Sequence, residues 1–470
     1  MIGTIARKEL LEYWRDARLV TAMMILILLF GFGLLSGWLA YLDLSRQAQK
    51  AGLDERERWL TQSDKHPHAA AHYGVFAFKS PRLLSILDSG IQPFVGSAVW
   101  LEAHKQNEML YRPAEDATSL QRFGDLTVAT VGQALLPLLI IFMGYTAFAG
   151  EREQGTLKQL SAIGIEPWQL LAGKALAQGG VLMIVLLPVF GLSLVIVVLF
   201  APPDVRIDEL ERLTLFAACY LIYLGGYLFL TLAVSAGCRS SRLALVLLLA
   251  FWALSVLLAP RMLSDWARDK YPSTSAITRK HTLEETLERE VAAKIDKKIK
   301  QLLADYQVSK IEDLPVDPTG VILQTDEEAS YAPFEDFYQN FFDRLRAQNR
   351  FYQIGALISP MAGLQLVSMA LTGNDLEQHR DFIEQAEKTR RLMHTLLNEY
   401  VPRHSVKNTR GEWELEAGSE LWKQIPSFHY VPRPWTTILP HYRIGLGVLL
   451  AWLGWTVVAA ILALPRMQRI

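Results

Sequence analysis

Apolar positions gather into long blocks along this chain, and polar positions gather into others. Six blocks are long enough to cross a bilayer as helices, because a hydrocarbon core of about 30 Å requires about 20 apolar residues. Backbone groups in lipid must satisfy one another within the segment, which favours helices. The six blocks are residues 19–42, 127–149, 175–200, 213–236, 243–263 and 444–464. The pattern predicts an all-α polytopic membrane protein with six transmembrane helices.

The first block is preceded by an amphipathic segment, residues 1–18. Its apolar side chains, among them Leu10 and Trp14, alternate with Arg and Lys, as in helices that lie in the cytoplasmic membrane interface. An ordinary basic flank is the alternative interpretation. The block itself exceeds a signal-peptide core of about 7–15 residues and has no small-residue cleavage site after it, so we expect it to be retained as a span.

Basic side chains predict the orientation of the spans, because Lys and Arg in short connections resist translocation. They cluster before the first block, between the second and third, between the fourth and fifth, and after the sixth. The residues are Arg7, Lys8, Arg15, Arg18, Arg152, Lys158, Lys174, Arg239, Arg242, Arg466 and Arg469. All four groups fall on one side, which we predict to be the cytoplasm of a bacterial inner membrane. Both termini are therefore expected inside.

The opposite side receives two long segments, residues 43–126 and 264–443, and a short acidic loop at 201–212. We expect each long segment to form a mainly helical extracytoplasmic domain.

The two cysteines are not expected to form a disulfide. Cys219 and Cys238 lie nineteen positions apart in one apparent helix, a distance of about 28 Å, which is too far for a disulfide bond. The formal net charge of -1 argues against a nucleic-acid partner, which requires a basic surface.

Two features that the sequence lacks limit how a membrane protein of this kind could be powered. The six apolar cores carry no clear ionisable residue near their midpoints, whereas ion-coupled carriers keep such residues in the membrane. The chain also lacks a G-x-x-x-x-G-K-[ST] loop: at its nearest approach, Gly173-Lys174, Trp168 replaces the first glycine and Ala175 replaces the hydroxyl residue. We expect no cofactor in this chain, so that any ATP and Mg²⁺ are bound by another subunit.

The connection between the second and third blocks, residues 150–174, begins with the string EREQGTL. Gly155 permits a tight turn, and Thr156 is suited to cap the helix that follows. Leu157, Leu160 and Ile163 would form one face of this helix. With six spans around it, this loop resembles the cytoplasmic loop of ABC-2-type permeases, a family of exporters.

The resemblance implies that this loop holds a coupling helix, which seats in a groove of a separate ATPase subunit. The residues assigned to this role are Glu151, Arg152, Glu153, Gly155, Thr156, Leu157, Lys158 and Leu160, of which all but Arg152, Lys158 and Leu160 match the family pattern. It further implies a non-enzymatic permease of an exporter with P-loop ATPase partners, a second permease copy or paralogue, and membrane lipids around it. The long outer segments resemble a subgroup with extended periplasmic parts. They leave the cargo, and a possible periplasmic partner, open.

Three patterns describe the larger outer segment. Apolar positions repeat every three or four residues over 283–306, which predicts a solvated helix with one apolar stripe. Aromatic positions over 334–345 predict a second helix, whose face we interpret as core in preference to a ligand or lipid contact. Residues 358–371 are apolar but too short to span, which predicts a re-entrant or interfacial helix. The aromatics approaching the sixth block, including Trp435 and Tyr442, suggest an interfacial belt.

A histidine tract in the first outer segment is a weak candidate for a metal site. It comprises His66, His68 and His72, and His68 with His72 would share a helix face. Pro67 interrupts the tract, and no Cys or acidic residue nearby completes a ligand set. Exposed linker histidines are the preferred interpretation.

Two other classes of function remain as alternatives to export. In the first, the ATPase cycle moves the outer domains, which act on an envelope partner, and no cargo crosses the membrane. In the second, the chain is a membrane sensor or an enzyme with two outer domains. The sequence contains no H-E-x-x-H or G-x-S-x-G motif and no cysteine in an outer segment, which argues against a hydrolytic enzyme.

Overall fold

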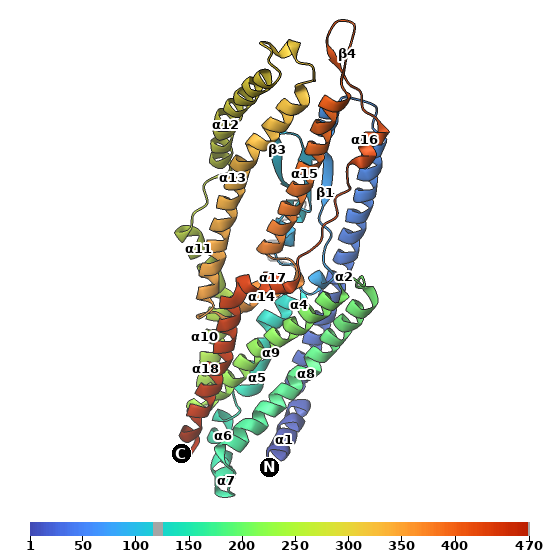
Figure 1. The fold of residues 1–470 in the computed structure, drawn as a ribbon. Helices are drawn as coiled ribbons and strands as arrows, with labels where there is room; N and C mark the ends of the chain where they lie inside the picture. The colour runs from blue at the N-terminus through green and yellow to red at the C-terminus, as the bar shows by residue number, and fades with distance from the viewer. Residues whose placement is uncertain (116–125, 469–470) are drawn as a thin grey trace.

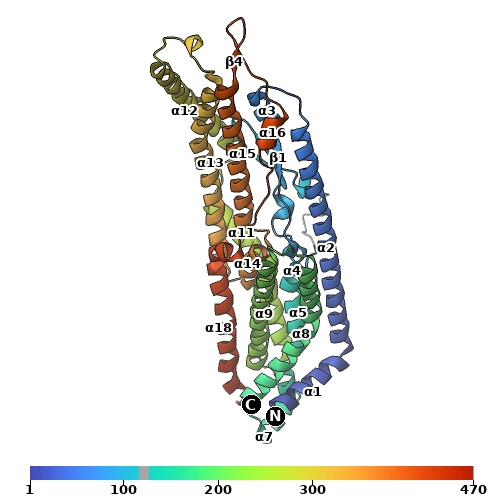
Figure 2. The same ribbon diagram turned by 45° about the vertical axis from the view of Figure 1, so that its right-hand side comes forward.

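The computed structural model describes residues 1–115 and 126–468. The molecule is elongated, and both chain ends lie at one end of it, beside α7 (Thr156–Ala162) (Figures 1 and 2). We call this the proximal end. The opposite, distal end is formed by a body of helices and a small sheet. Residue Arg469, one of the basic residues used to predict orientation, lies outside the described residues.

Within the described residues, six helical runs are long and apolar enough to cross a membrane. Each overlaps one of the six blocks in the sequence, which confirms the all-α polytopic class. The runs are α2 (Ala17–Leu60), α4 to α6 (Val128–Glu153), α8 (Pro167–Phe200), α9 (Arg206–Gly237), α10 to α11 (Ser241–Lys270), and α17 to α18 (Trp435–Pro465 within a helix that continues to Gln468). Helix α1 (Ile2–Arg15) precedes them and packs against α8.

The second and fifth runs each contain a wide, π-helical turn, at Val131–Leu135 and Ala253–Leu258. A proline follows each turn, at Pro137 and Pro260. Proline has no N–H, so the carbonyl four residues before it loses its helical donor. For Pro137 that carbonyl belongs to Gln133, and it accepts a hydrogen bond of 2.7 Å from the hydroxyl of Tyr223 instead. A neighbouring helix therefore satisfies the backbone that the proline leaves open.

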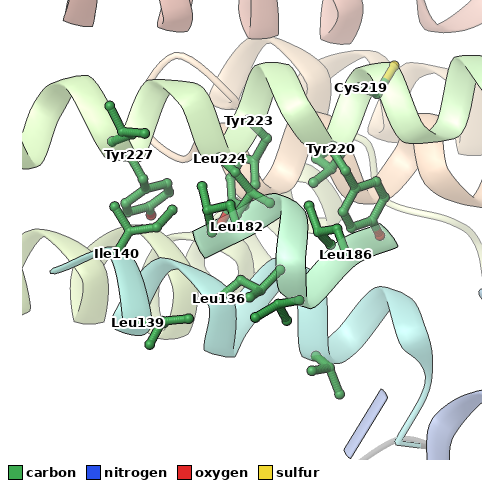
Figure 3. Close-up of a cluster of buried hydrophobic side chains, with 14 of the residues drawn as sticks. Leu136, Leu139, Ile140, Leu182, Leu186, Cys219, Tyr220, Tyr223, Leu224 and Tyr227 are labelled. Carbon is green, nitrogen blue, oxygen red and sulfur yellow. The ribbon is translucent and has the colours of Figure 1, made fainter. Parts of the chain in front are cut away.

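A row of tyrosines on α9 forms the centre of the membrane bundle. Tyr220, Tyr223 and Tyr227 point from one face of α9 toward α5 (Leu136–Gly144) and α8 (Figure 3). All three rings are buried. Their hydroxyls are also paired: Tyr220 with Gln133 at 2.9 Å and Tyr227 with Ser255 at 2.8 Å. The row thus packs apolar side chains and bridges both wide turns.

Helix α14 (Pro360–Thr372) fulfils the prediction of a short helix before the last span. It packs on α9 and α18 and is buried over most of its length. At its start, Ser359 donates to the carbonyl of Ser255 at 2.5 Å. Near its end, Ser368 donates at 2.5 Å to Asp88, which lies in the connection between β1 and β2.

The distal body combines elements from both outer segments. The first contributes α3 (Pro67–Tyr73) and an antiparallel sheet in the order β1 (Val75–Phe78), β2 (Ala98–Glu102), β3 (Lys105–Leu110), in which Phe76 is paired with Trp100. The second contributes α12 (Ala276–Asp305), α13 (Thr319–Gly355), α15 (Leu376–His404), the hairpin β4–β5 (Val406–Lys407, Trp413–Glu414) and α16 (Ser419–Gln424). The sheet is a feature that the sequence analysis did not predict.

The two outer segments, which the sequence analysis treated as separate domains, share one hydrophobic core. Trp59, at the far end of α2, packs edge-on against Trp422 of α16, with ring centroids 5.9 Å apart. Its indole N–H donates to the carbonyl of Trp422 at 2.9 Å. Val99 of β2 and Phe382 of α15 belong to the same cluster. The two outer segments therefore pack together as one body, into which α2 continues from the membrane.

The helices predicted from apolar stripes are present, with different burial. Helix α12 packs on α13 but buries none of its residues, so it is a peripheral helix. On α13 the aromatic residues Phe334 and Phe342 are buried, whereas Phe337, Tyr338 and Phe341 are half-buried, so the core interpretation holds for part of this face. Tyr442, by contrast, does not join an interfacial belt: it is buried, and its hydroxyl donates to Asp375 at 2.6 Å. Both cysteines are buried and free.

Candidate coupling site at the proximal end

The loop between the second and third spans folds into a short projecting helix. Helix α6 (Ala149–Glu153) ends, the chain turns, and α7 follows before α8 begins. Gly155 and Gly164 bracket α7 with φ of 74° and 82°, a left-handed conformation that strongly favours glycine. In Figures 1 and 2, α7 is the outermost element of the proximal end. We refer to residues 155–164 as the tip.

The base of the tip is held by a buried cation. Lys174, on the first turns of α8, is 1% exposed. Its ammonium group lies 2.7 Å from the carboxylate of Glu9 on α1 and 2.8 Å from that of Glu151 on α6. Three helices therefore meet at one ion cluster. A buried charge is tolerated only when it is paired in this way.

Lys8 extends this cluster toward the surface. Its ammonium group contacts Glu9 at 3.1 Å, Glu12 at 3.0 Å and Glu151 at 3.8 Å. Partial burial lowers the pKa of Lys8, but the neighbouring carboxylates of Glu9 and Glu12 outweigh this and raise it above its ordinary value. Lys8 therefore stays charged, so that two cations, Lys8 and Lys174, balance the carboxylates of Glu9 and Glu151.

Two further residues connect α6 to the other side of the bundle. The guanidinium of Arg152 donates to the carbonyl of Ala236 at 2.9 Å and to that of Cys238, at the end of α9. The carboxylate of Glu153 accepts from the backbone N–H of Ser241 at 2.9 Å and from its hydroxyl at 2.7 Å, at the start of α10. Acidic acceptors at a helix N-terminus are favourable because of the exposed N–H groups there.

The remaining residues assigned from the sequence are placed as follows. Leu157 is 1% exposed and anchors α7 to the bundle, and Leu160 is half-buried, whereas Ile163 is 70% exposed, so the three do not share a buried face. Thr156 does not cap α7 with its side chain, because Gly155 occupies the cap position. The Thr156 hydroxyl donates instead to the carbonyl of Glu151 at 3.1 Å, which closes the turn.

The outward surface of the tip is mixed in character. Lys158 is exposed, as are Ile163 and, beside the tip, Trp168 at 50%. The residues that fix the tip point inward, whereas Lys158 and Ile163 point outward.

Sequence reasoning missed Glu9, which lies 165 positions from Lys174. The available signal was an acidic residue on the apolar face of an amphipathic helix, since Ala6, Glu9 and Tyr13 are the buried residues of α1. It also missed a charged cluster at the other end of α9, where Arg82 contacts Asp208 at 2.5 Å and Glu209 at 2.9 Å. That cluster joins the connection between β1 and β2 to α9.

The histidine tract is rearranged relative to the prediction. His68 and His72 share one face of α3, as expected, and their Nε2 atoms are 3.2 Å apart. His66 is not part of this group: its Nδ1 accepts from the backbone N–H of His68 and caps α3. The third imidazole near them belongs to His104, from the turn between β2 and β3.

Two family models match the chain. That of the ABC-2 family transporter protein matches residues 104–274, which include the tip and the second to fifth helical runs. That of a domain of unknown function, DUF3526, matches residues 276–431, which cover α12 to α16 of the distal body. No curated protein matches the chain.

The fold and the first of these matches define a multi-pass membrane subunit of an ABC transporter. More specifically, the match over residues 104–274 supports an ABC-2-type permease. Such a subunit lacks a nucleotide-binding domain of its own, so the match implies a partner ATPase.

Proposed function

We propose that the chain is the permease of an ATP-driven exporter in a bacterial inner membrane, and that a separate P-loop ATPase docks on the tip. The observation that supports this most directly is the contrast between the two sides of α7. Its outward side exposes Lys158 and Ile163, and its base is tied to α1, α8, α9 and α10 through Glu151, Arg152, Glu153 and Lys174. A displacement of the tip is therefore transmitted to four helices at once.

The other parts of the proposal follow from this arrangement. The ATPase binds ATP and Mg²⁺, and its closure moves the tip. A second permease copy, identical or paralogous, completes the path for the cargo. The basic residues at the proximal end support a cytoplasmic position for it, because such residues resist translocation. The distal body then lies outside the cytoplasm.

A second candidate function is mechanical transmission without cargo. It is favoured by α2, a single helix of 44 residues and about 66 Å that runs from the membrane into the core of the distal body. Arg56 on α2 donates to the carbonyl of Ile425 at 2.7 Å, so the far end of this helix is fixed to the body. A movement of the bundle would reach the body through it and drive an envelope partner.

The docking assignment is tested with two matched substitutions. We expect Ile163→Asp to reduce, by at least about tenfold, the amount of P-loop ATPase that copurifies with the tagged chain from its native membrane, because a charge would be buried at the contact. Ile277→Asp is the control: Ile277 is 84% exposed, but it lies on α12 of the distal body. Recovery of the ATPase is measured by quantitative mass spectrometry, and ATP hydrolysis by the purified complex is measured in parallel.

Equal recovery of the ATPase with Ile163→Asp and with wild type would contradict docking on the tip. Reconstitution of the complex in vesicles separates the two candidate functions. ATP-dependent accumulation of a compound in the lumen of inside-out vesicles supports export. ATP hydrolysis that changes the protease accessibility of the distal body, with no accumulation, supports mechanical transmission.

A further inference from the structure

Three histidines converge on one point at the surface of the distal body. His68 and His72 lie one turn apart on α3, and His104 lies in the β2–β3 turn. One nitrogen of each lies within 4.8 Å of the others. The ring centroid of His104 is 5.3 Å from that of His68 and 5.3 Å from that of His72. Side chains from two separate elements are thus brought into one cluster.

The backbone around His104 is held in an uncommon conformation. Its φ is 65°, in the left-handed region that non-glycine residues rarely adopt. Its N–H donates to the carboxylate of Glu327 on α13 at 2.6 Å. Glu327 is in turn paired with the guanidinium of Arg390 on α15 at 2.7 Å. The contacts of the surrounding elements hold this turn in place, and a strained backbone conformation such as that of His104 persists only when it is held in this way.

The imidazole of His104 has a carboxylate behind it. Its Nδ1 contacts the carboxylate of Asp326, which leaves Nε2 as the atom that faces a ligand. This is the arrangement in which a carboxylate orients a metal-binding histidine and increases its basicity.

The spacing of His68 and His72 fits two ligands of one metal ion. Two nitrogens bound to one tetrahedral zinc ion at about 2.0–2.1 Å are about 3.3 Å apart. The Nε2 atoms of His68 and His72 are separated by 3.2 Å.

A hydrogen bond between His68 and His72 is the simpler account of that one distance. It does not account for the convergence of His104 or for the carboxylate that orients it. We propose that His68, His72 and His104 form a binding site for a divalent transition-metal ion that prefers imidazole, with Zn²⁺ as the representative. Three nitrogen ligands select such ions over Mg²⁺ and Ca²⁺, which prefer oxygen.

The site is open on one side, because His72 is exposed. Three protein ligands with a free fourth position are typical of sites where the metal exchanges or reacts, whereas structural sites are closed by four ligands. Through Glu327 and Arg390 the site also connects α3 and the sheet to α13 and α15. Bound metal would therefore fix α3 against the β2–β3 turn, which Glu327 holds to α13. This inference is independent of the proposed export function.

The test uses the full chain purified in detergent and stripped of metal with a chelator. Zn²⁺ is titrated by calorimetry, and Co²⁺ is used as a spectroscopic probe, since tetrahedral nitrogen coordination produces visible absorption. We expect one ion per chain. We expect His72→Gln and His104→Gln each to weaken Zn²⁺ binding by more than about 100-fold, and Asp326→Asn to weaken it by about 10–100-fold.

Two control variants separate this cluster from other histidines. His281→Gln removes an exposed imidazole on α12. His66→Asn removes the histidine next to the cluster and keeps a side chain that caps α3. Both are expected to bind Zn²⁺ as wild type does. Each variant is first shown to elute and to unfold as wild type does without metal.

Three results would overturn the site: fewer than half an ion bound per chain, unchanged affinity in His104→Gln, or a loss in His66→Asn as large as that in His72→Gln. The last result would point to a local histidine tract without His104. A metal-dependent rise in melting temperature for wild type that is absent in His104→Gln would support the site by a readout that does not depend on calorimetry.

Discussion

Lys174 is the residue at which the proximal end of the molecule converges. Its carboxylate partners come from α1 and α6, and its own backbone belongs to α8. A lysine before an apolar block is ordinarily explained as a basic flank that orients the span. Here it is buried, so its positive charge also organises the base of the tip.

Replacing Lys174 with methionine removes the cation and leaves two carboxylates buried together. We expect Lys174→Met to lower the free energy of unfolding by about 3–5 kcal/mol, as is typical when one partner of a buried ion pair is deleted. Thermal unfolding in detergent measures the change. Lys158→Met, at an exposed position on the tip, is the control and should unfold as wild type does. A Lys174→Met protein with wild-type stability would show that the cluster is not a structural anchor.

At the scale of elements, α1 is attached to the bundle by a close approach as well as by charge. A Cβ atom at Gly173 would lie 2.6 Å from Cγ2 of Ile5 and 3.2 Å from the carbonyl of Ile2. A larger side chain at position 173 would therefore collide with α1. Gly179, on the same helix, has no atom within 4 Å of its would-be Cβ.

This contrast predicts opposite responses to the same substitution. Gly173→Leu should displace α1 at a cost of about 1–3 kcal/mol, whereas Gly179→Leu should be neutral or slightly stabilising because leucine favours helix. The rate of trypsin cleavage within α1, which contains Arg7 and Lys8, measures its detachment. If both variants are cleaved at the wild-type rate, α1 is not held at this contact.

Helices with a strong local pattern were predictable at this scale. The six spans and α12 to α14 follow from apolar blocks and stripes, because burial in lipid or against one neighbour depends on residues close in sequence. The three-stranded sheet was not predicted. Its strands have 4, 5 and 6 residues, and β3, read as KQNEML, has a largely polar sequence. Pairing with distant residues, which a short local pattern does not report, determines such strands.

At the scale of the whole molecule, the distal body is one unit that receives helices from the membrane. Trp422 is fully buried and contacts Trp59, so the last outer segment completes a core that the first one began. The ion cluster of Arg82, Asp208 and Glu209 joins the connection between β1 and β2 to α9, so the first outer segment is also tied to the bundle. Movements of the spans and of the body are therefore linked at more than one place.

A shared core predicts that both outer segments lose protection together. We expect Trp422→Ala to destabilise the distal body by about 3–5 kcal/mol, the usual cost of truncating a buried aromatic side chain. Limited proteolysis followed by mass spectrometry should then show increased cleavage both in residues 61–115 and in residues 376–431. Trp266→Ala is the control, since Trp266 is 50% exposed. Increased cleavage confined to the second segment would indicate two separate domains.

The sequence alone determined the number of spans, the basic character of one side, and the position of the loop that becomes the tip. These features depend on composition over about 20 neighbouring residues, which decides between water and lipid. Only the tertiary structure decided that Glu9 meets Lys174, that His104 joins His68 and His72, and that Trp59 and Trp422 share a core. Each of these contacts joins residues separated by tens to hundreds of positions, and the path of the chain between them is set by packing of the whole fold.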